Sequence, residues 1–339
     1  MNAGGLLILF SVFVPKIYFV SLMGVILSLL TFPCYFIIKL KTMPEVKFSF
    51  KYFDFKSIWK MISSGLWNTL NQCGNLLMTG FDLLLANLLL GPSPMGILSV
   101  AKTIPNCIIQ LGATVNTTFS PNLTIAYASG DNEQILKSLR YSMKCSSFLM
   151  SIPLMVLCVF GVGFYKLWVP SLDAVQLTVL SVVTCSSFIL FAGPQTLYNV
   201  YTTTNKLKIN SLSVVVGGIL NIIIVWILVK FTNLGLYAIA GVSSVISIIR
   251  NLIITVPYTA KLLGLRWYTF YKDVLISLTC CVLSAGACFL MDILIKPNSW
   301  ITMFVSVGIA CVISAILIFA ILLNKDEKKK FMQRFKKGE

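Results

Sequence analysis

Long apolar segments recur along the whole chain, and they constrain its fold more than any other feature of the sequence. About 20 helical residues cross the hydrocarbon layer of a membrane, and runs of this length are separated here by short polar breaks. A soluble core cannot bury so much apolar surface, because 57% of the 339 residues are hydrophobic and only 11% are charged. The runs lack the alternation of apolar and polar residues that marks membrane strands. The sequence therefore predicts an all-α polytopic membrane protein.

These runs predict about ten transmembrane helices, of which the first is too short to cross a membrane alone. We expect them at residues 4–14, 17–38, 58–90, 96–128, 140–163, 172–202, 207–229, 235–260, 273–295 and 300–323. The third run continues from Lys56 to Leu90 without a polar break. A helix of about 35 residues is about 50 Å long, so we expect it to tilt or to project from the bilayer.

The placement of the basic residues predicts the orientation. The chain has 27 Lys and Arg residues and a formal net charge of +16. They are concentrated on alternate connections and in the C-terminal tail, which indicates membrane topology and not a nucleic-acid partner. Basic residues near helix ends stay on the cytoplasmic side. With ten crossings, both termini of this multi-pass protein are predicted to face the cytoplasm from the inner membrane.

No motif of an enzyme or of a cofactor site is found in the sequence. There is no His, so the commonest metal ligand and neutral-pH base is missing. Neither a Walker-type glycine-rich loop, nor a zinc-binding spacing, nor a Ser/His/Asp set is present. We therefore expect a non-enzymatic protein with no catalytic residue, no metal ligand and no cofactor.

Polar residues follow one face of the third predicted helix and one face of the fourth. Steps of three or four residues place such side chains in line along a helix, and lipid does not tolerate a polar line of this length. The stripe of the third helix contains Asn68, Asn71, Gln72, Asn75, Thr79 and Asp82. The stripe of the fourth contains Lys102, Asn106, Gln110 and Thr114. The short turn at 91–94 predicts that the two helices form an antiparallel hairpin.

Asp82 and Lys102 are predicted to lie within about 3 Å in depth, counted at helical rise from the turn. Each charge alone costs at least about 2.5 to 3.5 kcal/mol at a helix centre, so a partner or a wet cavity is expected. Two interpretations stay open. One is an ion-coupling or substrate-facing pair, and the other is a structural salt bridge or a Lys102 side chain that extends to the membrane surface.

Two further polar groups lie inside predicted spans. Arg250 lies about 15 Å from either end of its helix, where it either binds phosphate oxygens in a bidentate manner or bonds to a neighbouring helix. Gln195 and Asn199 follow Gly193 and Pro194. They form either the polar lining of a hinge or hydrogen bonds between helices.

Three segments resemble a known family of membrane transporters. The runs SSGLWNTLNQ (63–72) and FDLLLANLLLGPSPMGILSVAKTIPN (81–106) are similar to the seventh and eighth helices of polysaccharide flippases. The stretch from Phe191 to Asn221 is similar to a later part of the same proteins. This family is the oligosaccharide-lipid branch of the multidrug and oligosaccharide exporter superfamily, and the resemblance covers nearly the whole chain.

The resemblance implies two six-helix lobes around a central cavity, with the N-terminal lobe truncated here. Residues 1–40 would be its remnant, 41–56 a cytoplasmic link, 57–260 the C-terminal lobe, 261–323 an added helix pair and 324–339 a basic cytoplasmic tail. Asp82, Lys102 and the stripes around them would face the cavity.

The implied function is flipping of an undecaprenyl-diphosphate-linked oligosaccharide for capsule, O-antigen or exopolysaccharide synthesis. The lobes would rock, coupled to H⁺ or Na⁺, among membrane lipids and polysaccharide-assembly proteins. The alternatives are a multidrug cation antiporter, which needs an acidic cavity, a non-transporting scaffold of a glycan-assembly complex, and a polytopic sugar polymerase or acyltransferase. The predicted outward loops are too short for such an enzyme.

Overall fold

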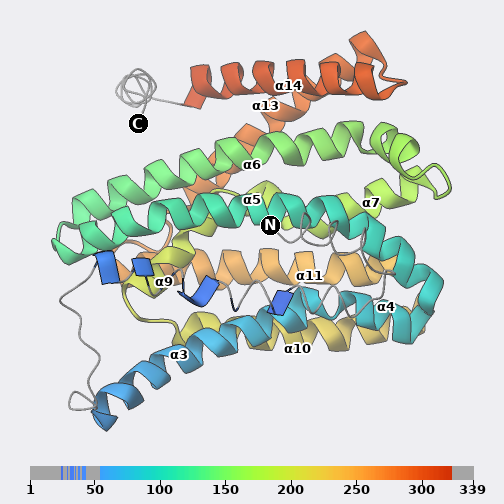
Figure 1. Ribbon diagram of the computed structural model, residues 1–339. Helices are drawn as coiled ribbons and strands as arrows, with labels where there is room; N and C mark the ends of the chain where they lie inside the picture. Colours follow the sequence, from blue (N-terminus) through green and yellow to red (C-terminus); the bar gives the residue numbers. More distant parts are fainter. Residues whose placement is uncertain are drawn as a thin grey trace. The chain divides into compact units, whose positions relative to one another are not determined.

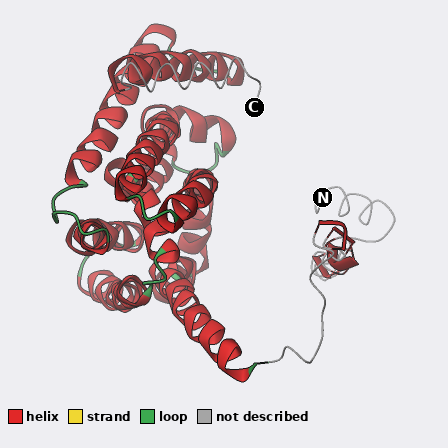
Figure 2. Cartoon of the chain, turned by 90° about the vertical axis from the view of Figure 1, so that its left-hand side faces the viewer, coloured by secondary structure: helices red, strands yellow, loops and turns green. Residues whose placement is uncertain are grey.

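The computed structural model describes residues 54–322 and a scatter of helical residues between 24 and 42. The chain divides into two compact units, Met1–Lys60 and Met61–Glu339. The predicted tail and the first predicted span lie outside the described residues, and the second span and the link at 41–56 lie mostly outside them. Figure 1 shows the helices, and in Figure 2 the part of the chain that is described contains helices and loops without a strand. The all-α prediction is confirmed.

The helices from Phe55 onward follow one another through short turns, and the first of them crosses the boundary between the two units. In chain order they are α3 (Phe55–Asn75), η2 (Leu76–Gly80), α4 (Asp82–Leu90), α5 (Pro92–Ala128), α6 (Asn132–Trp168), α7 (Ala174–Cys185), α8 (Ser187–Phe191), η3 (Pro194–Leu197), α9 (Tyr198–Thr203), α10 (Lys208–Phe231), α11 (Leu236–Arg250), η4 (Asn251–Thr255), α12 (Val256–Leu262), α13 (Tyr271–Ile295) and α14 (Trp300–Leu322). Asp131 and Asp173 cap α6 and α7 by accepting backbone N–H bonds of their first turns.

Six of these helical stretches are long and apolar enough to cross a membrane, and a bent pair raises the number to seven. They correspond to the predicted spans from 140–163 onward, together with 58–90. The chain is therefore a multi-pass α-helical membrane protein. Of the ten predicted spans, 96–128 is a continuous helix, α5, but it is not among the six. Its Asn, Gln and Thr side chains make it too polar.

The predicted unbroken helix at 58–90 is wrong. α3 passes through a π-helical turn, η2, and then bends by 41° at Phe81 before α4 begins. Such turns leave backbone carbonyls without their helical donors, and membrane helices tolerate them where neighbouring side chains supply the bonds. α4 then turns into α5 through Gly91, whose φ of 100° suits a residue without a Cβ. The predicted antiparallel hairpin is therefore present, with a bend in its first arm.

The predicted span at 172–202 is likewise broken, at Ser186 and again at Gly193 and Pro194. Serines of two other helices satisfy the backbone at the second break. Ser146 of α6 donates to the Ala192 carbonyl at 2.7 Å, and the Gly193 N–H donates to the Ser277 hydroxyl of α13 at 3.1 Å. The break is thus built into the packing of α6 and α13.

Packing of long helices side by side positions the site. In Figure 1, α5, α6, α10 and α11 run alongside one another, and α13 packs on both α6 and α14. Two buried apolar clusters hold this arrangement. One centres on the C-terminal half of α6 with α7 and α11, and the other joins the ends of α5, α12 and α13 to the start of α6.

Candidate functional site

A polar cavity of about 720 Å³ lies inside the second unit. It is bordered by α3, α5, α10, α11 and the broken segment from α7 to α9, and it is open on the side of α3 and α5, where Asn68, Asn75 and Asn106 are exposed. Its polar lining residues are Asn68, Asn71, Asn75, Thr79, Lys102, Asn106, Thr184, Ser187, Gln195, Tyr198, Thr202, Asn210, Ser243, Ser244, Ser247, Arg250 and Asn251. Two cations and no carboxylate are among the residues that line it. A cavity with this lining suits a hydrated ligand with negative charge.

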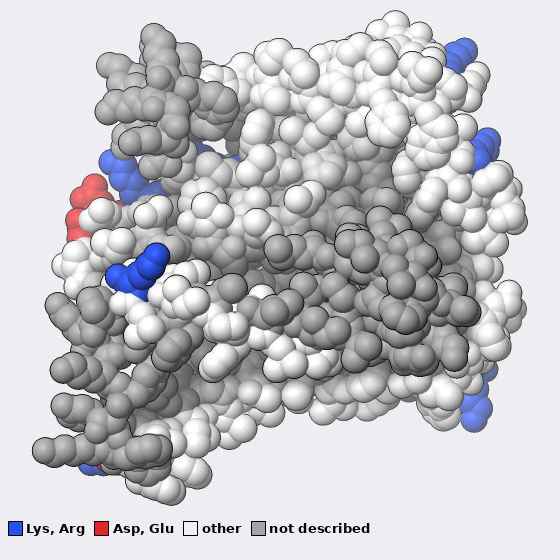
Figure 3. Space-filling view, in the orientation of Figure 1, with Lys and Arg blue, Asp and Glu red and all other residues white. Residues whose placement is uncertain are grey.

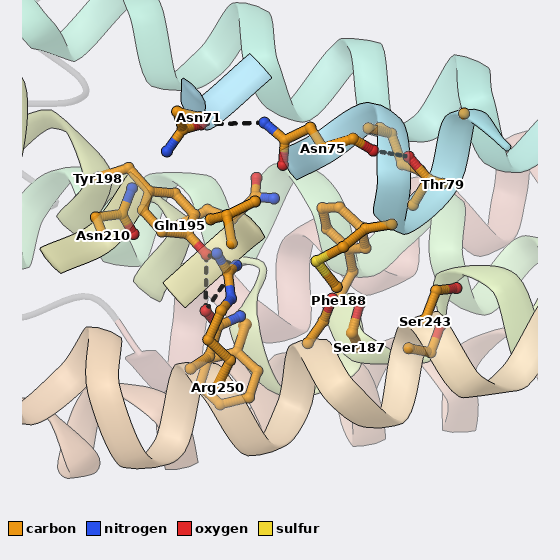
Figure 4. A pocket seen from close by; sticks show the side chains of 18 of the residues that line it. Asn71, Asn75, Thr79, Ser187, Phe188, Gln195, Tyr198, Asn210, Ser243 and Arg250 are labelled. Atoms are coloured by element: carbon orange, nitrogen blue, oxygen red, sulfur yellow. Dashed lines mark hydrogen bonds between the residues drawn. The ribbon is translucent and has the colours of Figure 1, made fainter. Parts of the chain in front are cut away.

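Within the part of the chain that the structure describes, Arg250 donates its hydrogen bonds to neutral groups. Figure 4 shows its guanidinium directed toward Tyr198 across the cavity. Its Nη2 donates to the Tyr198 hydroxyl at 2.6 Å and to Asn251 Oδ1 at 3.3 Å, and the guanidinium carbon lies 5.6 Å from the centre of the Tyr198 ring. Among the described residues no carboxylate lies within 4 Å of it. The Nε is fully buried and has no hydrogen-bond partner among the protein groups that are described.

Lys102 and Asp82 form a buried ion pair. Lys102 Nζ lies 2.5 Å from Asp82 Oδ2 and also donates to the Thr79 carbonyl at 3.1 Å. The two side chains are only 8% and 2% exposed. The two side chains meet at the same depth, as predicted, and the Lys102 side chain does not extend to the membrane surface. Lys102 borders the cavity, whereas Asp82 lies outside its lining.

The π-helical turn beside this pair is held by α10. Asn221 Nδ2 donates to the Met78 carbonyl at 3.0 Å and to the Leu77 carbonyl at 3.4 Å. Together with Lys102, Asn221 therefore satisfies carbonyls that the bend at Phe81 leaves without helical donors. Asn221 is fully buried, and the sequence analysis did not select it. The available signal was that Asn221 interrupts the apolar run from Val214 to Val229.

The structure brings six of the ten predicted site residues to the cavity, from four separate elements. These six are Asn68, Asn75, Lys102, Asn106, Gln195 and Arg250. Gln72, Asp82, Gln110 and Asn199 are not among its lining residues. Gln72 and Gln110 are exposed on α3 and α5.

Asn199 and Gln195 both bond to α5. The Asn199 amide donates to the Asn116 carbonyl at 2.9 Å, and the Asn116 amide donates to Gln195 Oε1 at 3.1 Å. Asn199 thus lies in a contact between helices. Gln195 takes part in the same contact and also lines the cavity.

Tyr198 and Asn210 are cavity residues that the sequence analysis missed. Tyr198 is the nearest partner of Arg250, yet 52 residues separate them in the chain. No periodic pattern joins them, because the break at Gly193 and Pro194 sets the direction of the Tyr198 side chain. Asn210 is buried at the start of α10 with its Oδ1 unbonded among the described groups. It lies in the first turn of α10, outside the two polar stripes, so helical spacing gave no signal for it.

Charges elsewhere lie at the ends of the helices. On the face shown in Figure 3, the Lys, Arg, Asp and Glu side chains that are visible among the described residues gather at the two ends. This distribution is the one expected for helices that cross a bilayer. Fold and cavity together define the class: a polytopic α-helical membrane protein with a polar, cationic cavity among its helices.

Comparison with known proteins gives a distant relative that is also a membrane protein. The chain is 27% identical over 336 residues to the uncharacterized membrane protein EpsK of Bacillus subtilis (strain 168). The aligned part is 98% of this chain and 65% of EpsK, so the chain spans less than two thirds of that relative. No protein-family profile matches the chain, and no solved structure is significantly similar to it.

Proposed function

We propose that the chain forms the C-terminal lobe and added helix pair of a flippase for an undecaprenyl-diphosphate-linked oligosaccharide. Such a substrate has a sugar and a diphosphate that must cross the apolar layer and a polyprenyl tail that stays in it. A protein that moves it needs a hydrated path with basic groups inside a bundle whose outer surface is apolar. The proposed transport is alternating access of two lobes in the inner membrane, with both termini cytoplasmic, for capsule, O-antigen or exopolysaccharide synthesis.

The observation that supports the proposal most is that Arg250 lines the cavity with no carboxylate near it among the described residues. A planar guanidinium with neutral partners keeps its full charge for a ligand and can bind two phosphate oxygens at once. The amide and hydroxyl groups around it suit the hydroxyls of a sugar, since they donate and accept hydrogen bonds. Lys102 adds less charge, because Asp82 neutralises it. The proposed anion site is therefore at Arg250, with Tyr198 and Asn210 beside it.

The other candidate functions fit the cavity less well. A multidrug cation antiporter needs an acidic lining, and the lining residues include no Asp or Glu. A scaffold has no need for a polar cavity in the middle of its bundle, where polar groups are costly. Coupling to H⁺ or Na⁺ and contact with polysaccharide-assembly proteins belong to the proposal as further expectations.

Binding of the lipid carrier tests the proposal without requiring transport. We expect the purified chain in detergent to bind undecaprenyl diphosphate more tightly than undecaprenol, which has the same tail without phosphate. Arg250→Gln should weaken diphosphate binding about tenfold or more, because hydrogen bonds to charged groups contribute about 1.5–3 kcal/mol. It should not change undecaprenol binding.

The matched control for Arg250→Gln is Lys230→Gln. Lys230 is an exposed basic residue in the last turn of α10, at the opposite end of that helix from Asn210, and it lies against the Trp226 ring. Equal affinity for the two lipids, or equal loss in both variants, would count against the proposed anion site.

A further inference from the structure

A second hollow lies on the outer side of the bundle, apart from the polar cavity. It measures about 440 Å³ and lies between the start of α10 and the η4–α12 helix. Ile209, Ile253, Ile254 and Pro257 form its apolar wall. Lys261 and Trp267 also line it, and no acidic residue is among the described residues that do. We call these residues the α10–α12 groove.

The groove is apolar at one position along the helix axis and basic at another. Ile253 and Lys261 are eight residues apart on one helical stretch, so they are separated by about 12 Å along its axis. Ile253 is 68% exposed, deep within the stretch, whereas Lys261 is exposed in the last turn of α12. An apolar slot that leads to a cation at the membrane interface matches one acyl chain and the phosphate of a lipid.

Contacts between aromatic rings hold the wall of the groove in place. The ring of Tyr258 stacks on Tyr201, with 5.7 Å between ring centres, and Tyr201 is itself buried. The Trp267 ring packs edge-on against Tyr268 and Tyr271 at 5.7 and 5.8 Å. Trp267 nevertheless remains 64% exposed, as indoles at a membrane interface often do. The slot is therefore formed before a lipid arrives.

Charge complementarity selects the occupant. Lys261 has no carboxylate within 4 Å in the described part of the chain, and Arg266 lies in the adjoining turn, bonded to the Tyr268 hydroxyl. Uncompensated basic groups beside an apolar slot favour a headgroup with net negative charge over a zwitterionic one. We infer that the α10–α12 groove binds an anionic phospholipid, with an acyl chain along Ile253 and Ile254 and its phosphate at Lys261.

Trp267 makes occupancy of the groove measurable, because brominated acyl chains quench tryptophan fluorescence on contact. The chain is reconstituted in phosphatidylcholine bilayers that contain either brominated phosphatidylglycerol or brominated phosphatidylcholine with the same chains. The difference between the unmodified chain and Trp267→Phe isolates the signal of Trp267. We expect half-maximal quenching at an about fivefold lower mole fraction of phosphatidylglycerol, the factor that one basic residue contributes at an anionic surface.

Two variants separate a site from a general attraction to a basic surface. Lys261→Gln should abolish the preference for phosphatidylglycerol. Lys137→Gln removes an exposed basic residue from α6 at the same end of the bundle, and it should leave the preference intact. Equal quenching by both lipids, a preference that survives Lys261→Gln, or a preference that Lys137→Gln abolishes equally would each overturn the inference. These outcomes are independent of whether the polar cavity binds a lipid-linked sugar.

Discussion

Lys102 and Asp82 show how a charged pair is kept within an apolar bundle. Each charge alone would lose its hydration, and the pair recovers this loss only through close contact and added hydrogen bonds. Here the ammonium bonds to the carboxylate and to the Thr79 carbonyl, which the bend at Phe81 exposes. The pair therefore stabilises the bend as well as itself, and removal of one partner leaves the other charge buried.

Lys102→Met should lower the free energy of unfolding by about 3–5 kcal/mol, because it leaves the Asp82 carboxylate buried without its partner. Asp82→Asn in the same chain removes that charge and should restore a large part of the loss. Chemical denaturation in detergent measures both variants, with Lys166→Met at an exposed position as the control. If Lys102→Met alone is as stable as Lys102→Met combined with Asp82→Asn, the pair has no structural role.

The sequence predicted this pair but not the surroundings of Arg250. Asp82 and Lys102 lie on two arms of one short hairpin, so counting from the turn gave their depth. The partners of Arg250 come from the broken segment after Gly193, where helical periodicity no longer tells which side chains share a face. Four of the six predicted residues that line the cavity, Asn68, Asn75, Lys102 and Asn106, belong to stripes of regular spacing. Tyr198 and Asn210, which were not predicted, lie beside a break and at a helix start.

At the scale of elements, glycines let α10 approach the α3–η2 segment closely. A Cβ built on Gly218 would lie 2.5 Å from the Leu77 Cβ and 3.0 Å from the Gly74 carbonyl oxygen. A Cβ on Gly74 would lie 2.7 Å from the Val215 backbone nitrogen. This close approach brings Asn221 to the carbonyls of the π-helical turn, so it helps to fix the bend that shapes the cavity wall.

Gly218→Ala should therefore destabilise the protein by about 1–3 kcal/mol, since rigid groups must move to admit the methyl group. Gly286→Ala is the matched control, because Gly286 also lies inside a membrane helix but has no atom within 4 Å of its Cβ position. The unfolding midpoints of the two variants give the comparison. If both substitutions shift the midpoint equally, the two helices are not in tight contact.

The sequence predicted where the helices lie better than where they break. Long apolar runs set the helices from α6 to α14, because length and hydropathy are properties of the segment itself. The bends at Phe81 and Ser186 depend on donors from distant helices, such as Asn221 of α10. Around Phe81, Thr79 and Asp82 continued the helical spacing of the polar stripe, so they gave no sign of the bend. The break at Gly193 was signalled by the Pro194 that follows it.

At the scale of the whole molecule, the described helices combine an apolar exterior with a polar cavity between them. Large apolar side chains such as Leu290 and Phe304 are exposed on α13 and α14, where lipid can cover them. The polar cavity lies inside the same bundle, with Arg250 as its main uncompensated charge. A transported sugar requires that water enters this cavity, and a static anchor does not.

Access of water to the cavity is the most direct test. In a background with the exposed Cys73 and Cys107 replaced by Ser, cysteine is introduced at the cavity wall by Ser247→Cys and on the outer face of α13 by Leu290→Cys. We expect a membrane-impermeant thiol reagent to modify the first variant rapidly in the bilayer and to leave the second unmodified. If Ser247→Cys is as unreactive as Leu290→Cys from both sides of the membrane, the cavity is dry and the proposed transport function is contradicted.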